Sequence, residues 1–159
     1  MAFLEVLSDG INRWVERLLV LLGTTMAAVV AAQVFFRYGL NQSLFWSEEL
    51  ARYQLVWLSF LGATVAYRRQ ANPSIDALYR RLPVGVQRAM GVIVHLCSLA
   101  LFGVMVLYGT QFAHFVRSQI SPALHLPKWL PHAVIPLSGA ILFLHALTFL
   151  VHELREKRV

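Results

Sequence analysis

The sequence predicts an all-α integral membrane protein with four transmembrane helices and a short amphipathic helix at the membrane surface. Hydrophobic residues make up 58% of the 159 residues and charged residues only 14%, too little charge to cover a soluble domain. Four apolar runs each approach or exceed the length that crosses a bilayer. Arginines, prolines and tryptophans gather between these runs. We therefore predict a single membrane domain over residues 1–159.

The first predicted span covers residues 15–37, approximately. Residues 1–14 before it are mildly amphipathic, and we expect them to lie on the membrane surface. The apolar run 18–36 spans roughly 28 Å as a helix, enough to cross the hydrocarbon core. Because cleaved secretory signals have shorter apolar regions, we expect this span to be retained.

The second predicted span, residues 46–67, begins with charged residues. Its uncharged part covers only about 22 Å, so the span is complete only if Glu48, Glu49 and Arg52 lie at the hydrocarbon boundary. Carboxylates at that depth need partners, and Arg52 lies within one helical turn of both acids. A proton relay is the alternative role for the two acids. We predict a structural ion pair or a partner interface formed by Arg37, Trp46, Glu48, Glu49 and Arg52.

The segment after the second span predicts a short amphipathic helix at about residues 73–82. Pro73 suits the first turn, apolar residues recur at helical spacing and arginines take the other side. We expect this helix to lie in the membrane surface; a connecting helix packed on protein is the alternative. Its predicted surface residues are Ile75, Leu78, Tyr79, Arg80, Arg81 and Leu82.

Two further spans are predicted at about residues 88–117 and 129–152. A proline-rich loop that ends at Trp129 separates them, and Pro136 is a candidate kink in the last span. With the N-terminus inside, ten of the fourteen Arg and Lys residues fall on the inner side. This asymmetry predicts that both termini are cytoplasmic.

Small residues recur every three or four positions on the first two spans, a spacing that lets helices approach closely in lipid. These predicted packing residues are Gly23, Ala27, Ala31, Ser59, Gly62, Ala63 and Ala66. The net charge of +6 lies at the ends of apolar runs without a basic stripe, which argues against nucleic acid as a partner. We predict that the lipid bilayer surrounds the protein and is its non-protein partner.

The sequence offers little chemistry. The lone Cys97 lies in an apolar run without basic neighbours, so we interpret it as a packing residue. Among the histidines, one cross-helix pair such as His95 with His145 leaves haem ligation open, and a haem-bearing or redox membrane anchor is the alternative function. We predict no enzymatic activity, no cofactor, no metal site, no catalytic residue and no substrate site within this chain.

Several short elements of the sequence form a recognisable set. They are Phe36-Arg37-Tyr38, Asn41, Trp46-Ser47-Glu48-Glu49-Leu50-Ala51-Arg52, Trp57-Leu58-Ser59-Phe60-Leu61-Gly62-Ala63, Arg68-Arg69, Ile75-Asp76-Ala77-Leu78, Leu82-Pro83, Leu126-Pro127-Lys128-Trp129 and Ile135-Pro136-Leu137. In these elements the chain resembles a known family, the small membrane subunit (DctQ-type) of tripartite ATP-independent periplasmic (TRAP) transporters. The resemblance covers roughly residues 10–155. It departs from the family where members often have a histidine before the isoleucine of the surface helix; here the sequence is Asn72-Pro73-Ser74-Ile75.

The resemblance implies a multi-pass subunit of the bacterial inner membrane. It implies two protein partners, a large transport subunit and a periplasmic substrate-binding protein. In that family the large subunit holds the substrate and sodium sites and moves as an elevator, while the small subunit enlarges the static scaffold. The expected function is a part in ion-gradient-driven (sodium) uptake of an organic acid, such as a dicarboxylate or sialic acid, without ATP.

Overall fold

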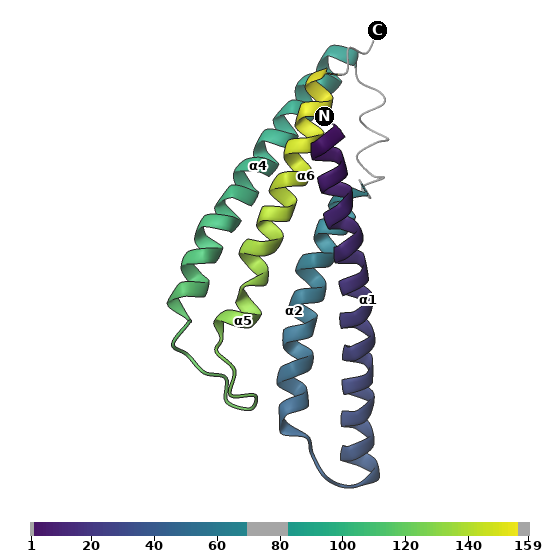
Figure 1. The fold of residues 1–159 in the computed structure, drawn as a ribbon, viewed down its shortest axis with the longest axis vertical. Coiled ribbons are helices and arrows are strands. Elements are labelled where there is room, and N and C mark those ends of the chain that lie inside the picture. The colour runs from purple at the N-terminus through teal and green to yellow at the C-terminus, as the bar shows by residue number, and fades with distance from the viewer. Residues whose placement is uncertain (1, 70–82, 156–159) are drawn as a thin grey trace.

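The computed structural model describes residues 2–69 and 83–155, and most of them are helical (Figure 1). The helices are α1 (Ala2–Gly39), α2 (Phe45–Arg68), α4 (Val84–Phe115), α5 (Trp129–His132) and α6 (Val134–Arg155). Within those two ranges there is no β-strand; the closest approach to one is an isolated antiparallel bridge between Ile120 and Pro127. The predicted all-α fold is confirmed.

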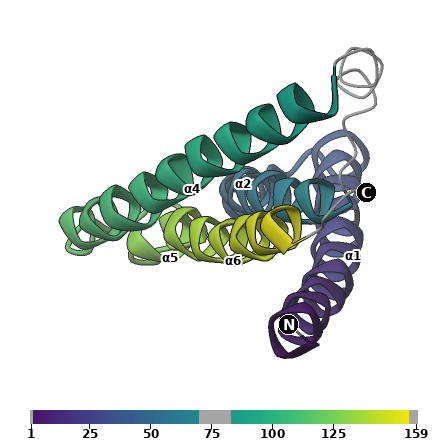
Figure 2. The ribbon, with the colours of Figure 1, turned by 90° about the horizontal axis from the view of Figure 1, so that it is seen from above.

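The four long helices run up and down, so that the start of α1 and the end of α6 lie at the same end (Figure 1). We call this end the terminal end and the opposite one the loop end. Helix α1 packs on α2, and α4 packs on α6. Helix α6 also contacts α2 and α1, so it joins the two pairs, as the view from above shows (Figure 2).

Three helical segments are long and apolar enough to cross a membrane: Leu4–Gly39, Gly85–Phe115 and Trp129–Leu154. The predicted second span forms helix α2 but is not one of the three. Its first three turns carry Glu48, Glu49 and Arg52, which lower its hydropathy. The predicted surface helix at residues 73–82, with Ile75, Leu78, Tyr79, Arg80, Arg81 and Leu82, lies outside the described residues.

Helix α1 is longer than the predicted first span, because the segment that we expected on the membrane surface continues the same helix. Its 38 residues extend about 57 Å. Ser8 and Val15 are buried against the other helices. These contacts explain why the first turns of α1 join the bundle.

The last predicted span is broken near its start. Helix α5 ends at His132 and α6 begins at Val134. Pro136 explains the break, because it lacks the N–H that would bond the carbonyl of His132, and its ring crowds that carbonyl. The chain turns at Ala133, whose N–H still donates to the Trp129 carbonyl at 2.8 Å.

Helices α4 and α6 approach closely at two glycines. A Cβ added at Gly109 would lie 3.0 Å from the backbone nitrogen of Pro136, and one at Gly139 would lie 3.3 Å from the backbone nitrogen of Val106. The buried side chains nearby include Phe102 and Leu142. Only residues without a Cβ allow this separation of the two helices.

Candidate functional site

Glu49 ties helix α2 to the proline-rich loop at the loop end. Its Oε2 accepts hydrogen bonds from the backbone N–H groups of Ala123 at 2.9 Å and Leu124 at 3.0 Å. Its Oε1 accepts a hydrogen bond from the Tyr53 hydroxyl. Hydrogen bonds to an ionised carboxylate are roughly twice as strong as neutral ones. One side chain of α2 therefore fixes a loop that is more than seventy residues away in sequence.

The loop that Glu49 holds is also bonded to itself. The backbone N–H of Ser121 donates to the Leu126 carbonyl, and that of Lys128 donates to the Gln119 carbonyl, both at 2.9 Å. His125 lies at the tip with a φ of 53°, in the left-handed region. These bonds give the loop a defined shape beside the first turns of α2.

The other residues of the predicted ion-pair group lie apart from Glu49. Glu48 accepts a hydrogen bond from Gln33 of α1 at 3.3 Å. The guanidinium of Arg37 lies over the ring of Tyr38. Trp46 is 43% exposed. Among the described residues, these side chains form no ion pair with one another.

The ion pairs of residues 2–69 and 83–155 are Arg68 with Asp9 and Arg69 with Glu16, both at the terminal end. The structure therefore does not pair Arg52 with either neighbouring acid, because Glu49 turns toward the loop. A role for these residues in contact with a partner stays a prediction.

One face of α2 is exposed along its whole length, and we call it the α2 outer face. Its residues recur every three or four positions, so they form a single stripe. Buried Leu61, Thr64 and Val65 lie on the opposite side. The stripe is charged and bulky toward the loop end and small toward the terminal end. It consists of Phe45, Glu48, Arg52, Leu55, Ser59, Ala63 and Ala66.

Most of the predicted small packing residues are exposed in the part of the chain that the structure describes. A Cβ at Gly23 would lie 4.0 Å from Leu58, whereas one at Gly62 would have nothing within 4 Å. Ala27 and Ala31 of α1 are exposed, as are Ser59, Ala63 and Ala66 of α2. That these small residues pack against a helix of a partner therefore stays a prediction.

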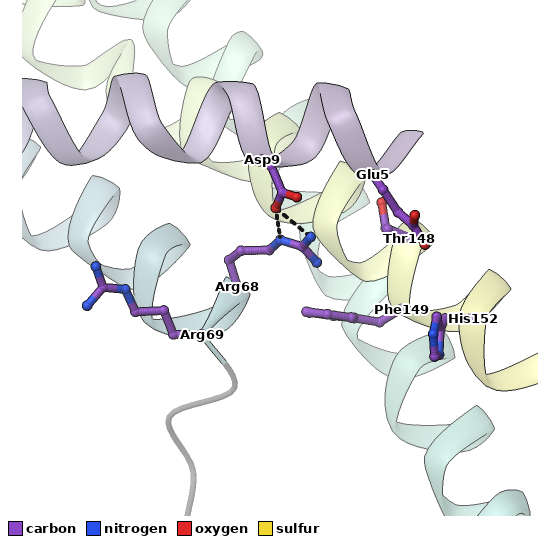
Figure 3. A pocket seen from close by; sticks show the side chains of 7 residues that line it. All are labelled: Glu5, Asp9, Arg68, Arg69, Thr148, Phe149 and His152. Carbon is purple, nitrogen blue, oxygen red and sulfur yellow. Dashed lines mark hydrogen bonds and ion pairs between the residues drawn. The ribbon is translucent and has the colours of Figure 1, made fainter. Parts of the chain in front are cut away.

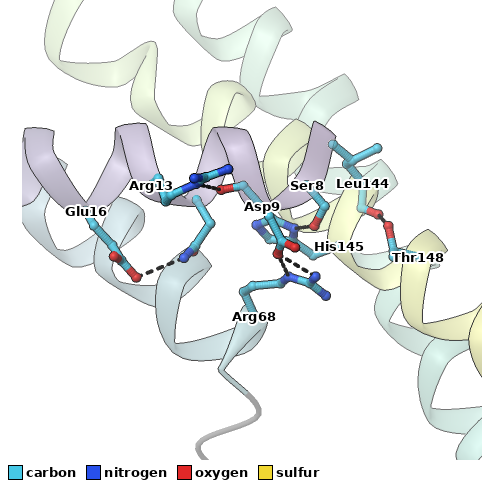
Figure 4. A network of polar contacts seen from close by, with 9 residues as sticks. Ser8, Asp9, Arg13, Glu16, Arg68, Leu144, His145 and Thr148 are labelled. Atoms are coloured by element: carbon cyan, nitrogen blue, oxygen red, sulfur yellow. Dashed lines mark hydrogen bonds and ion pairs between the residues drawn. The ribbon is translucent and has the colours of Figure 1, made fainter. Parts of the chain in front are cut away.

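The terminal end holds a polar cluster that sequence reasoning missed (Figure 4). Arg68 of α2 binds the Asp9 carboxylate of α1 at 2.7 Å, and its guanidinium lies over the Phe149 ring of α6. The Ser8 hydroxyl is 2.7 Å from Nδ1 of His145, and both residues are fully buried. This cluster joins α1, α2 and α6.

A pocket of about 390 Å³ opens beside this cluster, lined by both acidic and basic side chains (Figure 3). Its lining residues are Glu5, Asp9, Arg68, Arg69, Thr148, Phe149 and His152. One signal for the cluster was available in the sequence: Asp9 and Glu16 are seven residues apart, on one face of a helix. Recognising it required knowing that residues 1–14 belong to the first helix.

Three of the histidines have polar or aromatic neighbours from within the protein. His145 contacts Ser8, and Nδ1 of His132 is 2.6 Å from the Lys128 carbonyl. His95 packs on the Phe149 ring. Among the residues that the structure describes, no group of three or more His, Cys, Asp or Glu side chains is placed to hold a metal ion. Cys97 is exposed on α4.

The helical bundle, its apolar spans and the exposed face of α2 define a small multi-pass membrane protein. The comparison with protein families gives the particular class: residues 26–156 match the model "Tripartite ATP-independent periplasmic transporters, DctQ component". The chain belongs to this family, as the small membrane subunit of a TRAP transporter, and it is a transporter component and not an enzyme.

Individual relatives agree with this assignment. The chain is 27% identical to a putative TRAP transporter small permease protein of Haemophilus influenzae, over 91% of this chain and 90% of that protein. It is 28% identical to the sialic acid TRAP transporter small permease protein SiaQ of Vibrio cholerae, over 69% of this chain and 64% of that protein.

A longer relative also matches. The chain is 31% identical to the isethionate TRAP transporter permease protein DctMQ of Oleidesulfovibrio alaskensis, over 69% of this chain. The matched region is only 18% of that protein's length. A DctQ-type sequence thus also occurs as a minor part of a much larger permease, and family members work with a large permease subunit.

Proposed function

We propose that this chain is the fixed scaffold subunit of its TRAP transporter, with four transmembrane helices and both termini in the cytoplasm of a bacterium. It pairs in the inner membrane with a large transport subunit and, through the loop end, with a periplasmic substrate-binding protein. The assembly takes up an organic acid, such as a dicarboxylate or sialic acid, driven by an ion gradient, normally of sodium. The chain itself holds no transport site in this proposal.

The course of α2 supports the fourth span. Helix α2 has 24 residues, about 36 Å, and packs along α1 and α6, which are both long apolar helices. A helix packed between two spans crosses the same layer. In this arrangement Glu48, Glu49 and Arg52 lie at the outer boundary, and Arg68 and Arg69 lie at the cytoplasmic one.

The α2 outer face is the observation that carries the proposal of a scaffold. A helix that crosses lipid does not need small residues on its lipid side, but small residues let a second helix approach closely. Ser59, Ala63 and Ala66 are exposed on this face, and charged residues continue it toward the loop end. This pattern suits contact with another membrane helix, and the large subunit is the partner that we propose.

The names of relatives support an organic anion as the substrate class. SiaQ is named for sialic acid, and DctMQ for isethionate. Both solutes carry a negative charge at neutral pH, whereas ectoine, for which the relative TeaB of Halomonas elongata is named, carries a carboxylate but no net charge. The choice among such substrates belongs to the other subunits in our proposal.

Co-purification tests the proposed interface. Ala63→Trp places a large ring on the α2 outer face and should reduce recovery of the large permease of the same organism at least tenfold. Ala100→Trp adds the same ring to an exposed position of α4 and is the matched control. Equal recovery with both variants would reject the α2 outer face as the interface. Uptake into proteoliposomes by this chain alone would reject the scaffold role.

A further inference from the structure

A groove at the loop end combines cationic and apolar walls. Its volume is about 350 Å³, within the range of small-molecule sites. It lies between α2, α4, the loop after α4 and α5. Its lining residues are Arg52, Tyr53, Val56, Phe112, Val116, Gln119, Lys128, Pro131 and His132.

The cations of this groove are available to an anion. Arg52 is exposed, and within residues 2–69 and 83–155 it makes neither a hydrogen bond nor an ion pair. The Lys128 ammonium donates to the Gln119 side chain at 3.2 Å, which leaves further N–H donors. None of the described residues that line the groove is acidic. The nearby Glu49 carboxylate is already bonded to the loop and to Tyr53.

The apolar wall lies deeper than the cations. Val56 follows Arg52 by one helical turn toward the terminal end, and Phe112 precedes the end of α4 at Phe115. The ring of Phe112 meets that of His132 edge-on, with 5.2 Å between their centroids. A ligand that enters from the loop end therefore meets charge first and hydrocarbon next.

This order matches the boundary of a membrane. Lys128 precedes Trp129, an aromatic residue of the type that concentrates at headgroup level. Arginine and lysine at this level attract anionic lipids. A free anion would use the cations but not the apolar wall, and an acidic protein segment has no hydrocarbon chain to place against Val56 and Phe112.

We propose that this groove binds one anionic phospholipid, with its phosphate between Arg52 and Lys128 and the start of an acyl chain against Val56, Phe112 and Val116. The lipid lies between α2 and α4 and connects the two helix pairs at the loop end. This proposal requires that the loop end reaches a membrane surface and that Arg52, which also lies on the α2 outer face, stays open to the groove. The lipid test uses this chain alone, so its result does not depend on the scaffold role.

Native mass spectrometry of the delipidated full chain in detergent tests the site, with dioleoyl-phosphatidylglycerol as the titrated lipid. Each cation near a membrane surface contributes roughly a fivefold gain in affinity. Arg52→Gln with Lys128→Gln should therefore weaken the first binding event about 25-fold. Arg37→Gln with Arg117→Gln removes the same charge from other exposed positions at this end and should change the affinity for the first lipid less than twofold.

Two further variants address the groove itself. Val56→Trp keeps both cations but fills the apolar part, and it should weaken binding at least fivefold. Lys128→Gln alone changes a surface side chain, so it keeps the test valid if the double variant does not fold. Dioleoyl-phosphatidylcholine, which has no net charge, should bind the wild-type chain much more weakly than phosphatidylglycerol.

Three outcomes would overturn the proposal. Equal weakening in the two double variants would show attraction by charge in general. Displacement of the lipid by millimolar inorganic phosphate, together with full binding to Val56→Trp, would show a site for free anions. Unchanged lipid binding in Arg52→Gln with Lys128→Gln, accompanied by loss of the large permease in co-purification, would assign these cations to a protein partner.

Discussion

The contact between α4 and α6 at Gly109 gives the sharpest prediction about stability. A Cβ at this position would lie 3.0 Å from both the backbone nitrogen and Cδ of Pro136, and 3.1 Å from Cγ2 of Ile135. Ordinary carbon contacts are about 3.5–4.0 Å, so Gly109→Ala requires the helices to move apart. The proline ring and backbone cannot rotate away as a long side chain could.

The magnitude follows from two opposing effects. Overpacking a tight site costs about 1–3 kcal/mol, whereas alanine in place of glycine in a helix gains up to about 1 kcal/mol. Gly103→Ala, also in α4, has nothing within 4 Å of its added Cβ and should show only the gain. Gly109→Ala should therefore be less stable than Gly103→Ala by about 1–3 kcal/mol.

Unfolding in mixed detergent micelles, followed by circular dichroism as the fraction of sodium dodecyl sulfate rises, measures both variants under one condition. Gly109→Val should shift the midpoint further in the same direction, because its added methyl groups meet the same backbone. Equal midpoints for Gly109→Ala and Gly103→Ala would refute the argument that these helices touch through backbone at this position.

Three further predictions concern the polar contacts. Glu49→Ala should speed amide hydrogen exchange at Ala123 and Leu124 at least tenfold, since both N–H groups lose their acceptor. Glu48→Ala is the control. Equal exchange rates in the two variants would contradict the role of Glu49. Ser8→Ala should destabilise the bundle by about 1–3 kcal/mol, because it leaves the buried His145 ring without this partner. Ser59→Ala, at an exposed serine, should change stability by less than about 0.5 kcal/mol. Similar losses of stability in the two variants would argue against a structural role for the buried bond. A double-mutant cycle with Asp9→Asn and Arg68→Gln, measured by unfolding of the isolated chain in detergent, should give a coupling below about 1 kcal/mol, because the Asp9 side chain is 55% exposed. A coupling above about 3 kcal/mol would contradict this exposure.

The sequence predicted the helices better than their contacts. Apolar runs determine where a helix can cross lipid, and the all-α fold follows from them. The sequence suggested a kink at Pro136, and the helix is interrupted at Ala133, three residues before this proline. The continuation of α1 to Ala2 depends on Ser8 meeting His145, which is 137 residues away, and helical periodicity does not carry that information.

The candidate site shows the same division. The sequence placed Glu48, Glu49 and Arg52 at one end of a helix and indicated that the acids need partners. It suggested Arg52 because that residue is near in sequence, whereas Glu49 found its partners in the backbone of a distant loop. Backbone N–H groups have no signature in a sequence, so this choice could not be predicted from residue types.

The bond from Glu49 to the loop has a mechanical consequence when it is taken with the cluster at Arg68. The hairpin of α1 and α2 is attached to the hairpin of α4 and α6 at both extremities, by Glu49 at one and by Ser8 with His145 at the other. Two bodies attached at one point can hinge, but two attached at both ends of their length cannot swing without breaking one attachment. This chain should therefore keep its shape as one rigid body while its neighbours in the membrane move.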